Sequence, residues 1–144
     1  MDDINRFVKA QEQYNTYQTA LKEIKNGRKY THWIWFIFPQ LRGLGRSSTS
    51  EFYGIASLEE AKAYLADETL NARLREITTA LLAHNGKTAI EILGGIDALK
   101  VKSSMTLFDL ISPNDIYAEV LQKFYNGERC TSTLKLTAQN LNKI

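Results

Sequence analysis

Hydrophobic residues recur every three or four positions over most of this chain, a spacing that places them on one face of an α-helix. The first run lies within residues 3–26 and ends at Asn26-Gly27, a pair typical of a helix C-terminus. It predicts one amphipathic helix whose apolar positions are Ile4, Phe7, Val8, Tyr14, Tyr17, Leu21 and Ile24.

Capping residues mark the starts of further helices. Ser57 and Thr88 each have a glutamate three positions later, which is the capping-box pattern, and each precedes an apolar run. Asp67 can cap the next helix, whose inner face carries Leu70, Leu74, Ile77 and Leu81. The chain therefore has a helical pattern over most of residues 57–93.

The C-terminal third continues this pattern. Asp97 can open a helix over residues 97–111, and Ser112-Pro113 can begin another that Gly127 stops, with Pro at the first helical position. Thr131 or Ser132 can start a short last helix before a polar tail at residues 138–144.

The aromatic block of residues 33–38 is ambiguous. Its Trp, Ile and Phe residues favour a strand, while a continuous apolar run fits a buried helix equally well. In either form we expect most of these rings in the core. The glycine spacing after Pro39 and the polar run at residues 46–51 indicate a loop.

These elements predict an all-α fold, since the one plausible strand lacks a partner. We expect residues 1–144 to form a single helical domain, because this length suits one core and not two. The expected architecture is a compact bundle of five to seven helices that is not a simple up-down four-helix bundle.

Composition narrows the classes of function. The longest apolar run has six residues, whereas a spanning helix needs about 20, so we expect no membrane segment. The acidic N-terminus shows no secretory signal, which makes the cytoplasm the expected location. A net charge of +2, spread along the chain, does not indicate nucleic-acid binding. One Cys and two His provide no zinc spacing, so no metal and no cofactor are expected; the oligomeric state is not indicated.

Four motifs resemble those of a bacterial family called domain of unknown function 1810. They are THWIWFIFPQL at residues 31–41, GLGRS at 43–47, YGI at 53–55 and KSSMTLF at 102–108. The similarity extends over nearly the whole chain, from Asp3 to Phe124. It implies a single-domain, mainly helical protein and favours a buried helix for the aromatic block. The family brings no established activity, and nothing in these residues supports the label calpastatin that some of its sequences have carried.

The two edges of the aromatic block carry candidate site residues. His32 can exchange protons near neutral pH but needs a distant partner such as Asp109; more often such a histidine satisfies a backbone group. Arg42 and Arg46 flank two glycines and could bind a phosphate or carboxylate. An arginine beside glycines often merely holds a turn against a helix end, and no nucleotide-binding loop motif is present.

A second group of candidates lies on the predicted helix of residues 97–111. Lys102 and Ser104 accompany Ser103 and Thr106, so three hydroxyls interrupt an apolar pattern. Hydrogen bonds from these hydroxyls to carbonyls one turn earlier are the expected arrangement. A serine nucleophile would need an adjacent base, and a Ser-Lys pair has weak support.

The preferred hypothesis is a small domain that binds a phosphate-bearing or carboxylate-bearing small molecule. The proposed ligand-binding residues are Arg42, Arg46, Ser47, Tyr53, Lys102 and Ser104, with His32 beside them. One alternative is an enzyme, a hydrolase or transferase acting on a nucleotide-like substrate with His32 as acid or base. The other is a protein-interaction module that uses the loop from Arg42 to Tyr53.

Overall fold

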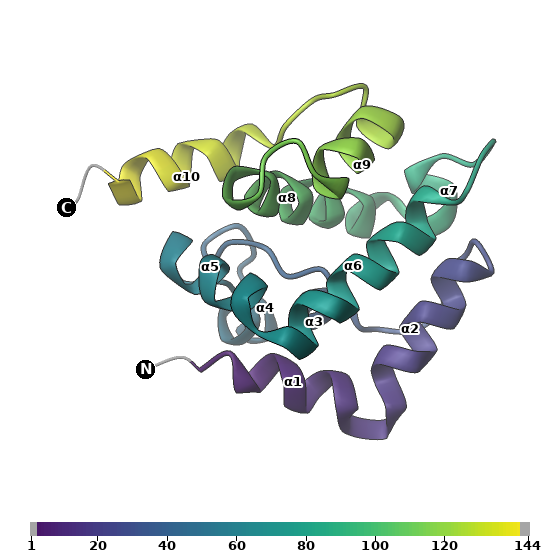
Figure 1. Cartoon of the computed structure of the whole chain (residues 1–144), viewed down its shortest axis with the longest axis horizontal. Coiled ribbons are helices and arrows are strands. Elements are labelled where there is room, and N and C mark those ends of the chain that lie inside the picture. Colours follow the sequence, from purple (N-terminus) through teal and green to yellow (C-terminus); the bar gives the residue numbers. More distant parts are fainter. Residues whose placement is uncertain (1–2, 142–144) are drawn as a thin grey trace.

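The computed structural model describes residues 3–141, and within this range the fold is all-α, as expected (Figure 1). The helices in chain order are α1 (Asn5–Glu12), the 3-10 helix η1 (Gln13–Asn15), α2 (Thr16–Lys25), α3 (Ile34–Ile37), α4 (Ser48–Tyr53), α5 (Leu58–Ala66), α6 (Glu68–Leu82), α7 (Ala89–Leu93), α8 (Gly95–Ile111), α9 (Ile116–Tyr125) and α10 (Thr131–Leu141). An isolated parallel bridge between Leu41 and Ile55 is the nearest approach to a sheet among these residues.

Helices α6 and α8 organise the single domain. Helix α8 contacts α5, α7, α9 and α10, while α6 lies between α2 and α9. In Figure 1, α8, α9 and α10 lie on one side of the molecule and α1 and α2 on the other. Large side chains from distant segments, including Phe7, Trp33, Tyr64 and Phe108, are fully buried together in the core.

Most predicted helix starts are confirmed by their caps. The Ser57, Asp67 and Thr88 side chains accept hydrogen bonds from the backbone N–H groups three residues later. Thr88 and Glu91 form the complete capping box. At Ser57 half of the box forms, because the Glu60 carboxylate reaches the backbone N–H of Ala56 instead.

The prediction of one helix over residues 3–26 is wrong in its middle. Tyr14 and Asn15 both have a φ of 55°, so the chain leaves the right-handed helical region between α1 and α2. The break lets α2 change direction and pack on α6, where Tyr17 and Ile24 become buried. Burial of this face outweighs the cost of two left-handed residues.

Three other boundaries differ from the prediction. Helix α8 begins at Gly95, so Asp97 lies in its first turn and does not open it. The polar run at residues 46–51 is not all loop, because Ser47 caps the short helix α4. Helix α9 begins at Ile116 and not at Pro113, since Asp115 accepts the Ile116 N–H and is itself held by Ser112 and Arg75. This ion pair therefore links the start of α9 to α6.

The aromatic block forms the short buried helix α3, the alternative that the family resemblance favours. Trp33, Ile34, Ile37 and Phe38 are at most 2% exposed, in agreement with a core role. The predicted polar tail at residues 138–144 begins inside α10, which continues to Leu141; residues 142–144 lie outside the described range. Thr133 and Thr137 on α10 are buried, because this helix packs against α8.

Candidate functional site

The segment that carries His32 is fixed by one buried carboxylate. Glu23 accepts hydrogen bonds from the backbone N–H groups of Tyr30 and Thr31, from the Thr31 hydroxyl and from the Trp33 indole. Burial of Glu23 opposes its ionisation, but these hydrogen bonds outweigh burial and lower the pKa of the carboxyl. His32 itself is exposed to solvent, at the surface of this fixed turn.

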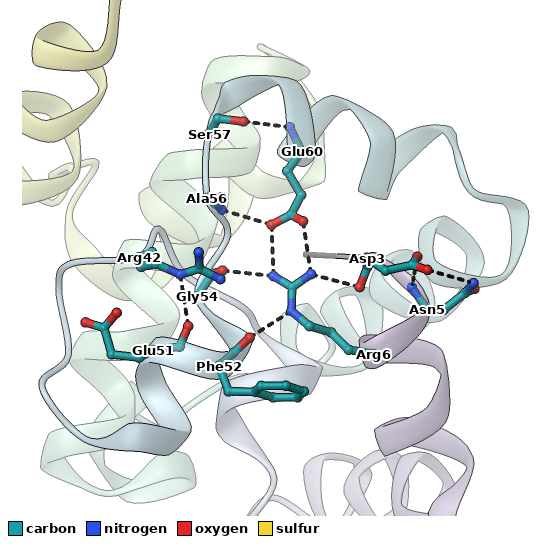
Figure 2. Close-up of polar contacts among 10 residues, drawn as sticks. All are labelled: Asp3, Asn5, Arg6, Arg42, Glu51, Phe52, Gly54, Ala56, Ser57 and Glu60. Carbon is teal, nitrogen blue, oxygen red and sulfur yellow. Dashed lines mark hydrogen bonds and ion pairs between the residues drawn. The ribbon is translucent and has the colours of Figure 1, made fainter. Parts of the chain in front are cut away.

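Arg6 holds the end of α4 and the segment that follows it (Figure 2). Its Nη1 and Nη2 atoms each lie 2.9 Å from a Glu60 oxygen, and its remaining N–H groups donate to the carbonyls of Asp3, Phe52 and Gly54. All five N–H donors of this guanidinium are therefore used. The cluster ties α1, α4 and α5 together and leaves Arg6 no free donor for a ligand.

Arg42 also has a structural contact. Its Nε donates to the Glu51 carbonyl at 2.9 Å, near the end of α4 (Figure 2). Ser47 is the cap of the same helix, and Tyr53 packs against the rings of Phe7, Phe36 and Phe52. Arg46 is exposed, on the turn just before α4.

Two hydroxyls of α8 form the expected bonds to carbonyls one turn earlier. Ser103 donates to Leu99 at 3.1 Å and Thr106 donates to Lys102 at 2.8 Å. Ser104 is fully buried, and its hydroxyl has no hydrogen-bond partner within residues 3–141. Its burial keeps Ser104 out of reach of a ligand on the surface.

A groove of about 720 Å³ lies beside α8, within the range of small-molecule sites. It is bounded by the loop after Pro39, by the first half of α8 and by the junction between α9 and α10. Its lining residues are Gln40, Leu44, Gly45, Ile96, Leu99, Lys100, Lys102, Ser103, Glu128, Arg129, Cys130, Thr131 and Ser132. Three sequence segments that are far apart therefore meet at this groove.

Cys130 lies where the groove meets the start of α10. Its carbonyl accepts the first hydrogen bond of that helix, from Leu134 N–H at 3.2 Å, so Cys130 occupies the N-cap position. Its own N–H donates to Thr106 Oγ1 at 2.9 Å, and the Ser103 hydroxyl lies 3.2 Å from its Sγ. The hydroxyls of α8 thus hold this cysteine in place.

The surroundings of the sulfur favour its ionised form. Burial opposes ionisation, but the Ser103 and Thr133 hydroxyls and the N–H groups of Thr133 and Ser132 outweigh burial, so the pKa of Cys130 is lowered. Thiols at helix N-termini commonly show this effect, because the amides and the helix dipole stabilise negative charge.

The groove carries more cations than carboxylates. Lys100, Lys102 and Arg129 line it together with one acid, Glu128. Lys102 Nζ lies 3.3 Å from Glu128, Arg129 is paired with Asp109 at 3.1 Å, and Lys100 Nζ lies 5.3 Å from the centre of the Trp35 ring. An anion entering the groove would meet this excess of positive charge.

A second hollow of similar volume lies along α6 and α2, but three of its polar side chains are engaged in the fold. Arg75 forms two hydrogen bonds with Asp115, Glu76 accepts from the Tyr17 hydroxyl, and His84 contacts the Ile24 carbonyl. The groove beside α8 is therefore the better candidate site. No group of three or more His, Cys, Asp or Glu side chains within residues 3–141 is arranged to hold a metal ion, and none of the described helices is long and apolar enough to cross a bilayer.

The structure does not gather the predicted site residues in one place. Lys102 lines the groove, as do Gln40, Leu44 and Gly45 from the predicted motif loop, but His32, Arg42, Arg46, Ser47, Tyr53 and Ser104 are not among its described lining residues. Sequence reasoning considered Cys130 for disulfides and zinc and missed it as a site residue. The available signal was its position directly before Thr131, a predicted helix start.

The chain belongs to the family of proteins of unknown function DUF1810, whose model matches residues 1–137. It is similar to the conserved hypothetical protein Rv1873 from Mycobacterium tuberculosis, known from a crystal structure. The two share 44% sequence identity and superpose with a TM-score of 0.91, over 94% of this chain and 96% of that one. No curated protein matches the chain.

Proposed function

We propose that this protein binds a small molecule bearing a carboxylate or phosphate group in the groove between α8 and the start of α10. The observation that carries the proposal is the meeting of three cationic side chains with the N-terminus of α10 in one hollow. Backbone N–H groups at a helix N-terminus and nearby cations both favour an anion. The proposal moves the anion site away from Arg42, whose Nε holds α4.

The rest of the groove suits an apolar part of the same molecule. Ile96 and Leu99 are 73% and 65% exposed, and Leu44 also lines the groove. Exposed aliphatic side chains beside fixed polar groups are typical of small-molecule sites. The expected ligand therefore has an anionic end and an apolar body.

A cytoplasmic location is part of the proposal. A single unpaired thiol in a ligand groove suits a compartment that keeps cysteines reduced. No observation favours His32 as a catalytic residue, because it is exposed and is not among the described residues of the groove.

The proposal can be tested by titrating the protein with inorganic phosphate and with succinate while backbone amide signals are followed by NMR. We expect saturable shifts at Thr131 and Ser132, whose amides are in the first turn of α10. The double variant Lys100→Ala/Lys102→Ala should weaken the apparent affinity by roughly fivefold or more, because it removes two of three cations.

The matched control is Lys9→Ala/Lys62→Ala, which removes two exposed lysines of α1 and α5 that do not line the groove. It should leave the titration unchanged. The absence of shifts at the start of α10, or equal weakening by both double variants, would contradict the proposed site.

A further inference from the structure

Cys130 is the one nucleophilic side chain among the described lining residues whose surroundings favour reaction. It is half-buried, so part of its surface faces the groove, and the chain contains no other cysteine. We infer that Cys130 forms mixed disulfides with small acidic disulfides that bind in the groove. This inference rests on the proposed anion site and adds a covalent step to it.

The first support is the set of donors around the sulfur. The Ser103 hydroxyl lies 3.2 Å from Sγ and 3.1 Å from the Leu99 carbonyl, so its single proton can be directed to either atom. With a protonated thiol it donates to Leu99, and with a thiolate it can rotate to donate to sulfur. The N–H groups of Ser132 and Thr133 at the start of α10 also favour the ionised form of the sulfur.

The second support is the Thr133 side chain. It is fully buried, its hydroxyl has no hydrogen-bond partner among residues 3–141, and this hydroxyl is one of the groups that favour the ionised form of the sulfur. A buried hydroxyl without a partner destabilises the state in which it occurs. Negative charge on the sulfur would provide the missing acceptor. The hydroxyl therefore has a partner when Cys130 is a thiolate and lacks one when Cys130 is a protonated thiol.

Disulfide exchange demands less of the groove than acyl transfer does. Acyl transfer requires a positioned group that protonates the leaving atom in addition to the nucleophile. Exchange requires the thiolate and an accessible disulfide. Sγ attacks one sulfur of the small disulfide, the new Sγ–S bond forms as the old S–S bond breaks, and the leaving sulfur departs with the electron pair as a thiolate.

The step balances because the small disulfide is the oxidant. The proton of Cys130 passes to solvent and the released thiolate takes up a proton according to its own pKa. Cys130 is oxidised, and the released thiol is the reduced product. Because the chain has no second cysteine, the adduct cannot be resolved internally and persists until an external thiol attacks it.

The cations of the groove select the disulfide. Lys100, Lys102 and Arg129 favour a disulfide that carries carboxylates and disfavour one that carries amines. The preference acts between partly exposed charges, so it should weaken as salt is added.

The test measures adduct formation by intact mass at pH 7 with three probes: glutathione disulfide, which is acidic, bis(2-hydroxyethyl) disulfide, which is uncharged, and cystamine, which is cationic. The same protein unfolded in urea provides the reference rate for each probe, since its one cysteine is then freed from the fold. We expect the native protein to react with glutathione disulfide on the order of tenfold faster than the unfolded chain. The ratio of the native reaction rate to the unfolded reaction rate should be smallest for cystamine.

Substitutions test the nucleophile, the hydroxyl donor and the cations separately. Cys130→Ser should form no adduct, and Ser103→Ala, a change that suits a helix, should slow the native reaction with all three probes. Lys100→Ala/Lys102→Ala should remove the preference for the acidic probe, while Lys9→Ala/Lys62→Ala should retain it. If Ser103→Thr retains part of the reaction rate that Ser103→Ala loses, the role of the hydroxyl is confirmed.

A native thiol that reacts more slowly than the unfolded one with every probe would overturn the inference, and so would rates that do not follow probe charge. The phosphate titration distinguishes this failure from that of the proposed function. Amide shifts at Thr131 with an unreactive thiol would overturn the covalent step alone. Absent shifts together with absent charge selection would overturn both.

Discussion

The Trp33 indole Nε1 donates to Glu23 Oε1 at 3.0 Å, inside the core, while the same carboxylate accepts three hydrogen bonds from Tyr30 and Thr31. One acid of α2 therefore satisfies both the buried tryptophan and the turn that leads to it. Trp33 is fully buried and Glu23 is 8% exposed, so water cannot replace these bonds easily.

We predict that Glu23→Gln lowers the free energy of unfolding by about 2–3 kcal/mol, because a charged acceptor of four hydrogen bonds is lost. Urea unfolding measures this difference. Glu59→Gln is the control, since its side chain is 87% exposed in a weak pair with Lys62, and it should change stability little.

The Glu23 contribution should depend on pH. The pKa of Glu23 is lowered in the folded protein below its ordinary 4.5, so the carboxylate stabilises the fold above that value. As pH falls from 4.5 through the lowered pKa, the stabilisation is lost and the difference from Glu23→Gln narrows. A difference that stays constant down to acid unfolding would contradict this assignment.

Removal of Arg6 should be among the most damaging substitutions. The Glu60 side chain is 10% exposed in the native protein, and Arg6→Met removes its main cation, so we expect a loss of about 3–5 kcal/mol in urea unfolding. The double variant Arg6→Met/Glu60→Met should recover part of this loss, because no unpaired charge then remains. Lys62→Met breaks an exposed pair and should cost under about 1 kcal/mol; comparable losses for the two single variants would contradict a structural role for the Arg6 cluster.

Gly54 allows two segments to approach each other closely. A Cβ built there would lie 2.7 Å from Arg42 Cα and 2.9 Å from the Ser50 carbonyl oxygen, although its φ of −62° suits any residue. Gly54→Ala should therefore cost about 1–3 kcal/mol through crowding alone, measured by thermal or urea unfolding. Gly95→Ala, where nothing lies within 4 Å of the added carbon, should be neutral or slightly stabilising; similar effects at both glycines would refute the crowding argument.

Thr106 connects the start of α10 to α8. Thr106→Val keeps the shape of the side chain but leaves the Cys130 N–H without its acceptor, and we expect a loss of about 1–3 kcal/mol in urea unfolding. Thr137→Val is the matched change, because the Thr137 hydroxyl donates only within α10 to carbonyls of Thr133 and Leu134. It should cost less, and the reverse order would show that Thr106 does not anchor α10.

The helices that follow clear caps were predictable from the sequence. Ser57, Asp67 and Thr88 act within three residues of themselves, so their effect does not depend on the rest of the fold. The break at Tyr14 was not predictable, because the apolar spacing continues through it. The reason for the break lies in α6, against which α2 packs.

The residues of the candidate site were also only partly predictable from the sequence. Lys102 was identified from its motif and lines the groove. Arg42 contacts α4, the structural alternative that its position beside the glycines had offered, and Ser47 caps the same helix. Cys130 could be placed at a helix start from sequence alone. Its principal hydroxyl donor, Ser103, lies 27 positions earlier in the chain, so no local pattern could connect them.

The sequence by itself determined the all-α class, most helix starts, the buried aromatic block and the family, because these depend on periodicity, on caps within a few residues and on long contiguous motifs. The tertiary structure decided where a ligand could bind. It brought residues 40–45, 96–103 and 128–132 to one groove, and it left His32 and Arg46 on exposed turns. The physical reason is that burial of the helix faces sets which distant segments meet, and side chains at those meeting points acquire charges and hydrogen-bond partners that their own neighbourhood in the sequence does not specify.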